Sequence, residues 1–126
     1  MKIFFILAVM LLPLTYFNSN GQKAPGQADQ SFASFWSRFK IAVAKNDKEL
    51  VASMTKLPFL YAGKERNRAE FIRIFEGLFT TRVKKCIASA KPLKDGDSYE
   101  VFCAKTIFYF SRVEGQYRFT EIGADD

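Results

Sequence analysis

Four of the five tyrosines and one glutamate have the spacing that a ligand pocket or a proton-transfer pair would require. The tyrosines are Tyr61, Tyr99, Tyr109 and Tyr117, and Glu121 stands four residues after the last of them. On one strand Tyr117 and Glu121 would share a face, and an acid beside a phenol can transfer a proton. The simpler interpretation is that the tyrosines fill the edge of an aromatic core and that the Glu121 carboxylate is exposed to solvent. We favour that interpretation, keep these five residues as candidates for a pocket mouth, and assign no catalytic residue.

Two clusters of basic side chains form a candidate surface for an anionic partner. The first comprises Arg82, Lys84, Lys85, Lys91 and Lys94, and the second comprises Lys64, Arg66 and Arg68. Clustered cations attract lipid headgroups, cell-wall polymers or acidic proteins. In a sheet they also protect an edge strand from aggregation, and we favour that interpretation. We expect no nucleic-acid partner, because the chain lacks an aromatic and basic binding surface.

The N-terminal segment predicts a signal peptide over residues 1–21. Lys2 precedes an uncharged apolar run of fifteen residues, from Ile3 to Phe17. A transmembrane helix needs roughly 20 such residues, so an uncleaved anchor is the less favoured alternative. Small residues at Ser19 and Gly21 predict cleavage before Gln22. We expect a secreted or periplasmic protein with no integral membrane segment after cleavage.

The chain has no histidine and only two cysteines, Cys86 and Cys103. Histidine is the commonest metal ligand and the usual base at neutral pH, so we predict no metal site and no cofactor. In an oxidising compartment an even pair of cysteines most simply forms a disulfide. A metal site would need further ligand types, and a catalytic thiol would need a histidine.

The mature chain begins with a polar leader over 22–30 and continues as a single domain over 31–123. Apolar side chains recur at helical spacing after the leader: Phe32, Phe35, Trp36, Phe39, Ala42 and Val43. The spacing of Asn46 and Glu49 predicts a capping box and a second short helix that ends before Pro58. Trp36, on the first helix, joins the four tyrosines and Glu121 as a candidate pocket residue.

A third helix and an edge strand follow. The apolar run 57–61 contains Pro58, which suits an edge strand or an extended link, and 63–68 is a charged turn. Asn67 and Glu70 repeat the capping-box spacing. The apolar stripe of this third helix is Phe71, Ile74, Phe75, Leu78 and Phe79.

The remaining sequence predicts three antiparallel strands, over 82–91, 98–113 and 117–122, with turns at 92–97 and 114–116. Pairing Cys86 with Cys103 across the first hairpin would leave a loop over 93–96, and a turn at Asp95-Gly96 alone would place the two cysteines diagonally. The expected order is α-α-β-α-β-β-β. Helices first and a meander last predict an α+β fold with helices on one sheet face.

The stretches FASFWSRFKIAVAKNDKELVASM, LPF and NRAEFIRIF resemble the NTF2-like superfamily. The resemblance extends over about residues 30–122. It implies a cystatin-like cone, in which a curved antiparallel sheet wraps around N-terminal helices. The superfamily contains isomerase-like and dehydratase-like enzymes and also non-catalytic binding modules. Its catalytic members typically place Asp with His or Tyr inside the cone, and the absence of histidine here departs from that pattern.

The long predicted strand is apolar on both faces. Phe102, Phe108 and Phe110 would share one face, with Ile107 and Tyr109 on the other. By their even spacing, Tyr99 and Tyr109 would lie on the face of Cys103. A strand that is apolar on both faces must be covered on both. We therefore expect a homodimer through the sheet, an arrangement that the NTF2-like resemblance also implies.

Taken together, these patterns favour an exported, non-catalytic binding module. Its ligand would be a small hydrophobic molecule in an apolar cavity, or a protein partner on the sheet surface. The first alternative is an envelope inhibitor or immunity-type protein that uses the basic clusters. The second is an isomerase-like or hydratase-like enzyme, which would need a buried acid near Tyr99, Tyr109 or Tyr117.

Overall fold

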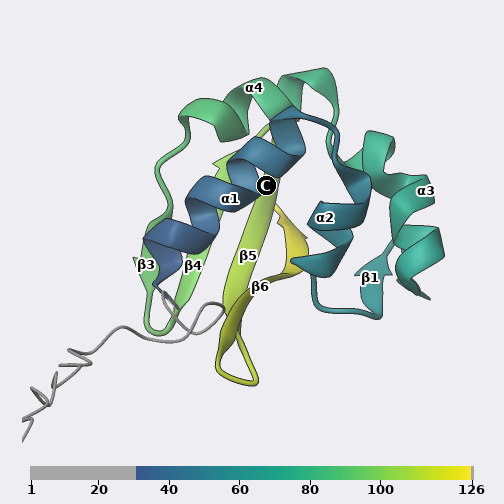
Figure 1. Ribbon diagram of the computed structural model, residues 1–126. Helices are drawn as coiled ribbons and strands as arrows, with labels where there is room; N and C mark the ends of the chain where they lie inside the picture. The colour runs from purple at the N-terminus through teal and green to yellow at the C-terminus, as the bar shows by residue number, and fades with distance from the viewer. Residues whose placement is uncertain (1–30, 126) are drawn as a thin grey trace, which may run out of the picture.

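The computed structural model describes residues 31–125 (Figure 1). The predicted signal peptide and leader, 1–30, lie outside the described residues. The helices are α1 (Phe32–Ala44), α2 (Lys48–Ser53), α3 (Arg68–Leu78) and α4 (Thr81–Ser89). The strands are β1 (Phe59–Tyr61), β2 (Lys64–Arg66), β3 (Leu93–Asp95), β4 (Ser98–Cys103), β5 (Thr106–Val113) and β6 (Gln116–Ala124). The described chain is therefore α+β, as predicted.

The strands form two antiparallel sheets, one of β1 and β2 and one in the order β3-β4-β5-β6. Figure 1 shows α1 lying in front of the larger sheet, with α4 above it and α2 beside it. Each connection in the larger sheet is a two-residue turn, because Asp95 pairs with Ser98, Cys103 with Thr106, and Val113 with Gln116. Such short turns suit a meander of consecutive strands.

The predicted single strand over 98–113 is wrong, because the chain reverses at Ala104-Lys105. Both residues have positive φ, 52° and 64°. A two-residue hairpin turn of this kind usually contains Asn, Asp or Gly. Ala104 and Lys105 belong to none of these three residue types, so the local sequence did not indicate a turn here. The predicted turn at 114–116 is confirmed as Glu114-Gly115, and the strand after it is longer than expected.

The predicted strand over 82–91 is also wrong, since these residues form α4. Thr80 caps the helix, its hydroxyl accepting a hydrogen bond from the Val83 N–H at 3.2 Å. Val83 and Ile87 are buried four residues apart, which is helical spacing. Both predicted hairpin registers fail for the same reason, and the first hairpin instead turns at Gly96-Asp97.

The disulfide prediction is confirmed despite that error. Cys86 on α4 is bonded to Cys103 at the end of β4, with Cα atoms 5.7 Å apart. Because the two cysteines come from a helix and a strand, the bridge ties α4 to the sheet that it covers. Among the described residues no cysteine remains free.

The three other predicted helices form near their expected positions. Asn67 and Glu70 make the capping box of α3, with both reciprocal hydrogen bonds present. The cap of α2 lies one residue later than predicted: Asp47 accepts from the Leu50 N–H, while Asn46 adopts a positive φ of 54°. The edge strand near 57–61 is confirmed as β1, but part of the charged turn predicted after it pairs back as β2.

Phenylalanine rings fill the core between the helices and the larger sheet. Phe39 on α1 lies at its centre, 5.1 Å from the Phe110 ring and 5.8 Å from the Phe119 ring. The largest fully buried aromatic side chains are Phe39, Phe59, Phe71, Phe75, Phe79, Phe108, Phe110 and Phe119. Every buried side-chain nitrogen or oxygen of the described residues has a hydrogen-bond partner. The interior is therefore packed with aromatic side chains rather than hollow.

The larger sheet has an inner face against α1 and an outer face. The inner face carries Tyr99, Val101, Cys103, Phe108, Phe110, Tyr117 and Phe119; the outer face carries Leu93, Asp95, Ser98, Glu100, Phe102, Ile107, Tyr109, Ser111, Arg118 and Glu121. Phe102 is 41% exposed and pairs with Ile107, so it does not share a face with Phe108. Tyr109 likewise faces away from Tyr99 and Cys103.

Candidate functional site

Three of the predicted pocket residues meet around the first residue of α1. The Phe32 ring stacks on Tyr99 at 3.7 Å and contacts the rings of Trp36 at 6.2 Å and Tyr117 at 5.4 Å. Tyr117 also lies 4.8 Å beneath the Arg112 guanidinium, and it raises the pKa of that group by hydrogen bonding first and by charge second. These side chains pack against one another, so the cluster closes one end of the core.

Tyr61 lies apart from that cluster, on β1 beside α3. Arg66 stacks on its ring at 5.8 Å and donates hydrogen bonds to its carbonyl oxygen at 3.3 and 3.2 Å. The Tyr61 hydroxyl passes 3.6 Å from where a Cβ of Gly77 would be. Gly77 therefore gives Tyr61 room to pack on α3.

The remaining two predicted residues, Tyr109 and Glu121, are direct cross-strand neighbours on the outer face. The register shifts between Tyr109 and Phe110, and Thr120 donates a hydrogen bond to the Tyr109 carbonyl at 3.1 Å. This irregularity inserts one extra residue in β6, so Tyr117 and Glu121 lie on opposite faces. The predicted Tyr117–Glu121 pair is wrong for that reason.

The first basic cluster belongs to α4 and the link that follows it. Lys84 is engaged there: its ammonium group donates to the side-chain oxygen of Asn46 and lies 5.9 Å over the Phe75 ring. Arg82, Lys85, Lys91 and Lys94 are exposed. In the described part of the chain these four form no ion pair. The edge-strand role predicted for the cluster applies only to Lys94, on β3.

The second basic cluster is held by internal partners. Lys64 pairs with Glu70 at 3.2 Å, and Arg68 pairs with Glu49 at 2.8 Å. The Asn67 backbone hydrogen bond, followed by Lys64, lowers the pKa of Glu70 below its ordinary value. These side chains tie β2, α2 and α3 together, so the cluster has a structural role.

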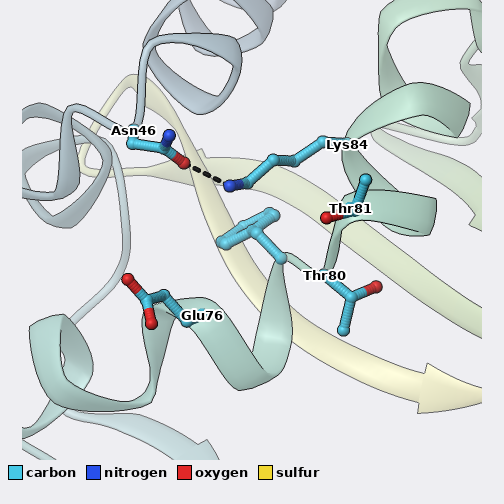
Figure 2. A pocket seen from close by; sticks show the side chains of 6 residues that line it. Asn46, Glu76, Thr80, Thr81 and Lys84 are labelled. Carbon is cyan, nitrogen blue, oxygen red and sulfur yellow. Dashed lines mark hydrogen bonds between the residues drawn. The ribbon is translucent and has the colours of Figure 1, made fainter.

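A polar hollow of about 280 Å³ lies at the start of α4, lined by Asn46, Glu76, Phe79, Thr80, Thr81 and Lys84. Figure 2 shows Lys84 reaching across it to Asn46, with Glu76 on the other side. Glu76 also binds Lys48 at 3.0 Å, and that hydrogen bond lowers its pKa. The two charges and the wide opening make this a hydrated surface feature rather than a catalytic pocket.

The outer face of the larger sheet carries several exposed or half-buried apolar side chains. Leu93 is 57% exposed and Phe102 41% exposed, and Ile107 and Tyr109 are half-buried without joining the core. The Tyr109 ring lies flat over Gly123, where a Cβ would approach its Cε2 atom to 3.0 Å. The sequence analysis placed Leu93 in a loop and Phe102 on the face of Phe108; the correct face of Phe102 depends on locating the Ala104-Lys105 turn.

No described helix is long and apolar enough to cross a membrane. Within residues 31–125, no three side chains of His, Cys, Asp or Glu gather in a way that could hold a metal ion. Comparison of the chain with known family models, with curated proteins and with solved structures finds no match. The resemblance to the NTF2-like superfamily therefore stays a prediction.

Proposed function

We propose that this protein is an exported, non-catalytic interaction module that binds a protein partner on the outer face of its larger sheet. The observation that carries the proposal is Phe102, a large aromatic side chain that is 41% exposed beside Ile107 on a face outside the core. Contiguous exposed apolar side chains mark interaction surfaces more often than isolated ones do. Aromatic residues also contribute much of the binding energy of protein interfaces.

The packed core favours a protein partner over a small hydrophobic ligand. A ligand cavity would lie between α1 and the inner face, where the rings of Phe39, Phe110 and Phe119 already touch. The hollow at α4 is polar and carries charges. An apolar ligand gains little in such surroundings.

An isomerase-like or hydratase-like enzyme has less support. Such a reaction would use a buried acid close to a tyrosine, because burial raises a carboxyl pKa into the working range. Within residues 31–125 no Asp or Glu side chain is buried, and the buried Thr55 hydroxyl donates to the Val51 carbonyl at 2.7 Å. Glu121 is exposed, as an ordinary surface carboxylate would be.

Export and the NTF2-like assignment belong to the same proposal. The disulfide between Cys86 and Cys103 supports an oxidising compartment, secreted or periplasmic. N-terminal helices packed on one face of an antiparallel meander support the superfamily assignment. The observed order α-α-β-β-α-α-β-β-β-β differs from the predicted α-α-β-α-β-β-β, since β2 and β3 are added, α4 replaces a predicted strand and the long predicted strand is divided into β4 and β5.

Site-specific photocrosslinking tests the proposed surface. A benzophenone amino acid in place of Phe102 should form one dominant protein crosslink in cells that make the protein naturally. The same amino acid in place of Leu60 or Ile41, which are 59% and 52% exposed elsewhere, supplies the matched control. The absence of a crosslink at position 102, or equal crosslinks from all three positions, would contradict the proposal. An adduct with the mass of two copies would identify a homodimer and contradict a separate partner.

A further inference from the structure

Two carboxylates flank Tyr109 on the outer face. Glu100 pairs with Tyr109 across β4 and β5, and Glu121 pairs with it across β5 and β6. Adjacent strands are about 4.8 Å apart, so the two backbone positions lie about 10 Å apart with the tyrosine between them. Leu93 pairs with Glu100 and continues the same row onto β3. The row therefore alternates apolar and acidic side chains across the sheet.

Neither carboxylate is neutralised by a cation of the described chain. The three ion pairs there involve Glu49, Glu70 and Glu76, all outside the larger sheet. Arg118 is the one basic residue on the outer face, and its guanidinium donates to the Tyr117 carbonyl and to the Gln116 side chain. Glu100 and Glu121 thus remain available to charges from outside.

The acidic character of this face contrasts with the rest of the domain. The outer face carries Asp95, Glu100 and Glu121 against one basic side chain, Arg118, whereas residues 31–92 contain thirteen basic and five acidic side chains. A partner that covers the outer face removes water from Glu100 and Glu121. Loss of that hydration costs free energy unless the partner supplies opposite charges.

We propose that the partner presents lysine or arginine side chains on both sides of an apolar strip, an inference that rests on the proposed function. The apolar strip contacts Phe102, Ile107 and Tyr109, and the flanking cations pair with Glu100 and Glu121. A second copy of this chain fits poorly, since a two-fold interface centred on Tyr109 would bring these carboxylates together. Like charges at an interface disfavour association.

A pair of synthetic peptides tests the charge preference. We would measure, by fluorescence anisotropy at low ionic strength, the binding of the labelled hexapeptide Lys-Lys-Leu-Leu-Lys-Lys, which in extended form presents a leucine between two lysines on each face, and of its counterpart with glutamate in place of lysine. The lysine peptide should bind at least tenfold more tightly, although the protein carries a net positive charge that repels it. Phe102→Ser should weaken this binding.

Charge-matched variants locate the effect. The double variant Glu100→Gln/Glu121→Gln should weaken lysine-peptide binding about tenfold, because it removes two ion pairs. Asp97→Asn/Glu114→Asn removes the same charge from two exposed turns and should change affinity less than twofold. Equal loss in both double variants would overturn the inference, because it would reflect net charge alone.

The remaining outcomes separate this inference from the proposed function. Equal affinity for both peptides, abolished by Phe102→Ser, would overturn the charge preference and leave the outer face as the binding surface. Failure of both peptides to bind, or binding that is unaffected by Phe102→Ser, would overturn the inference as well. In that case the photocrosslinking experiment at position 102 decides separately whether the outer face binds a protein partner.

Discussion

The two faces of the larger sheet are built from the same strands but differ in burial, and we propose different roles for them. On the inner face Phe108 and Phe110 are fully buried against helices and other rings. Neighbouring residues of the same strands point to the outer face. There Phe102 is 41% exposed and Tyr109 is half-buried between two carboxylates. The aromatic content alone therefore does not separate core from interface.

What separates the faces is the cover that the rest of the chain supplies. α1 packs on the inner face, and the disulfide bonds α4 to Cys103 at the end of β4. Substitutions on the inner face should therefore change stability, and substitutions on the outer face should change binding. Four experiments test that division.

The largest expected effect is from Phe110→Ala. Phe110 is completely buried and contacts the rings of Phe39 and Phe119 at 5.1 and 5.5 Å. Truncation of a buried phenylalanine costs about 3–5 kcal/mol of unfolding free energy, because a cavity remains. Urea unfolding followed by circular dichroism should show a loss of this size. A loss under about 1 kcal/mol would mean that the inner face is not the core.

Removal of the disulfide should have the next largest effect. The double variant Cys86→Ala/Cys103→Ala opens a loop between positions 17 residues apart. In the chain-entropy account, closing such a loop contributes about 3 kcal/mol. A reducing agent should lower the thermal midpoint of the wild-type protein and leave that of the variant unchanged. If the variant were as stable as the oxidised protein, the disulfide would not be what stabilises the packing of α4 on the sheet.

A smaller effect is expected from Thr80→Ala. The Thr80 hydroxyl accepts a hydrogen bond from the Val83 N–H and caps α4. Loss of such a cap costs about 1 kcal/mol. The neighbouring substitution Thr81→Ala is the control, since Thr81 is exposed and does not cap the helix. Equal thermal midpoints for the two variants would show that residues 81–89 do not depend on this cap.

The smallest change in stability should come from Phe102→Ser. Its side chain lies outside the core cluster, and surface substitutions usually alter unfolding free energy by about 0.5 kcal/mol or less. The same variant should lose peptide binding. Urea midpoints and anisotropy measured on one preparation check both expectations. A large loss of stability would show that the outer face belongs to the core and would erase the contrast between the faces.

The sequence predicted the helices best where cap and stripe agreed. For α3, the Asn67–Glu70 box and the spacing of Phe71 and Phe75 both indicated a helix, and both are present. For α4 the signals conflicted, since we interpreted 82–91 as a strand that would pair the cysteines across a hairpin. The Thr80 cap and the helical spacing of Val83 and Ile87 indicate a helix, and our interpretation of 82–91 did not use either signal.

One unrecognised turn changed the assignment of a whole face. Two residues reverse the chain at Ala104-Lys105, so odd-numbered positions of β4 share a face with even-numbered positions of β5. Phe102 therefore lies on the outer face rather than on the face of Phe108 and Phe110, where the sequence analysis placed it. The irregularity at Tyr109/Phe110 does the same for Glu121 relative to Tyr117. The sequence shows the residues of the outer face, but their grouping on one face could not be predicted without the turn and the irregularity.

The sequence by itself determined the α+β class, the disulfide partners and the first and third helices. These features depend on composition and on patterns within about a dozen neighbouring residues, such as capping spacing and helical periodicity. Tertiary structure alone decided the hairpin at Ala104-Lys105 and the side chains left on the outer face. Those features depend on pairing between distant strands, where the packing free energy of the inner face outweighs weak local preferences.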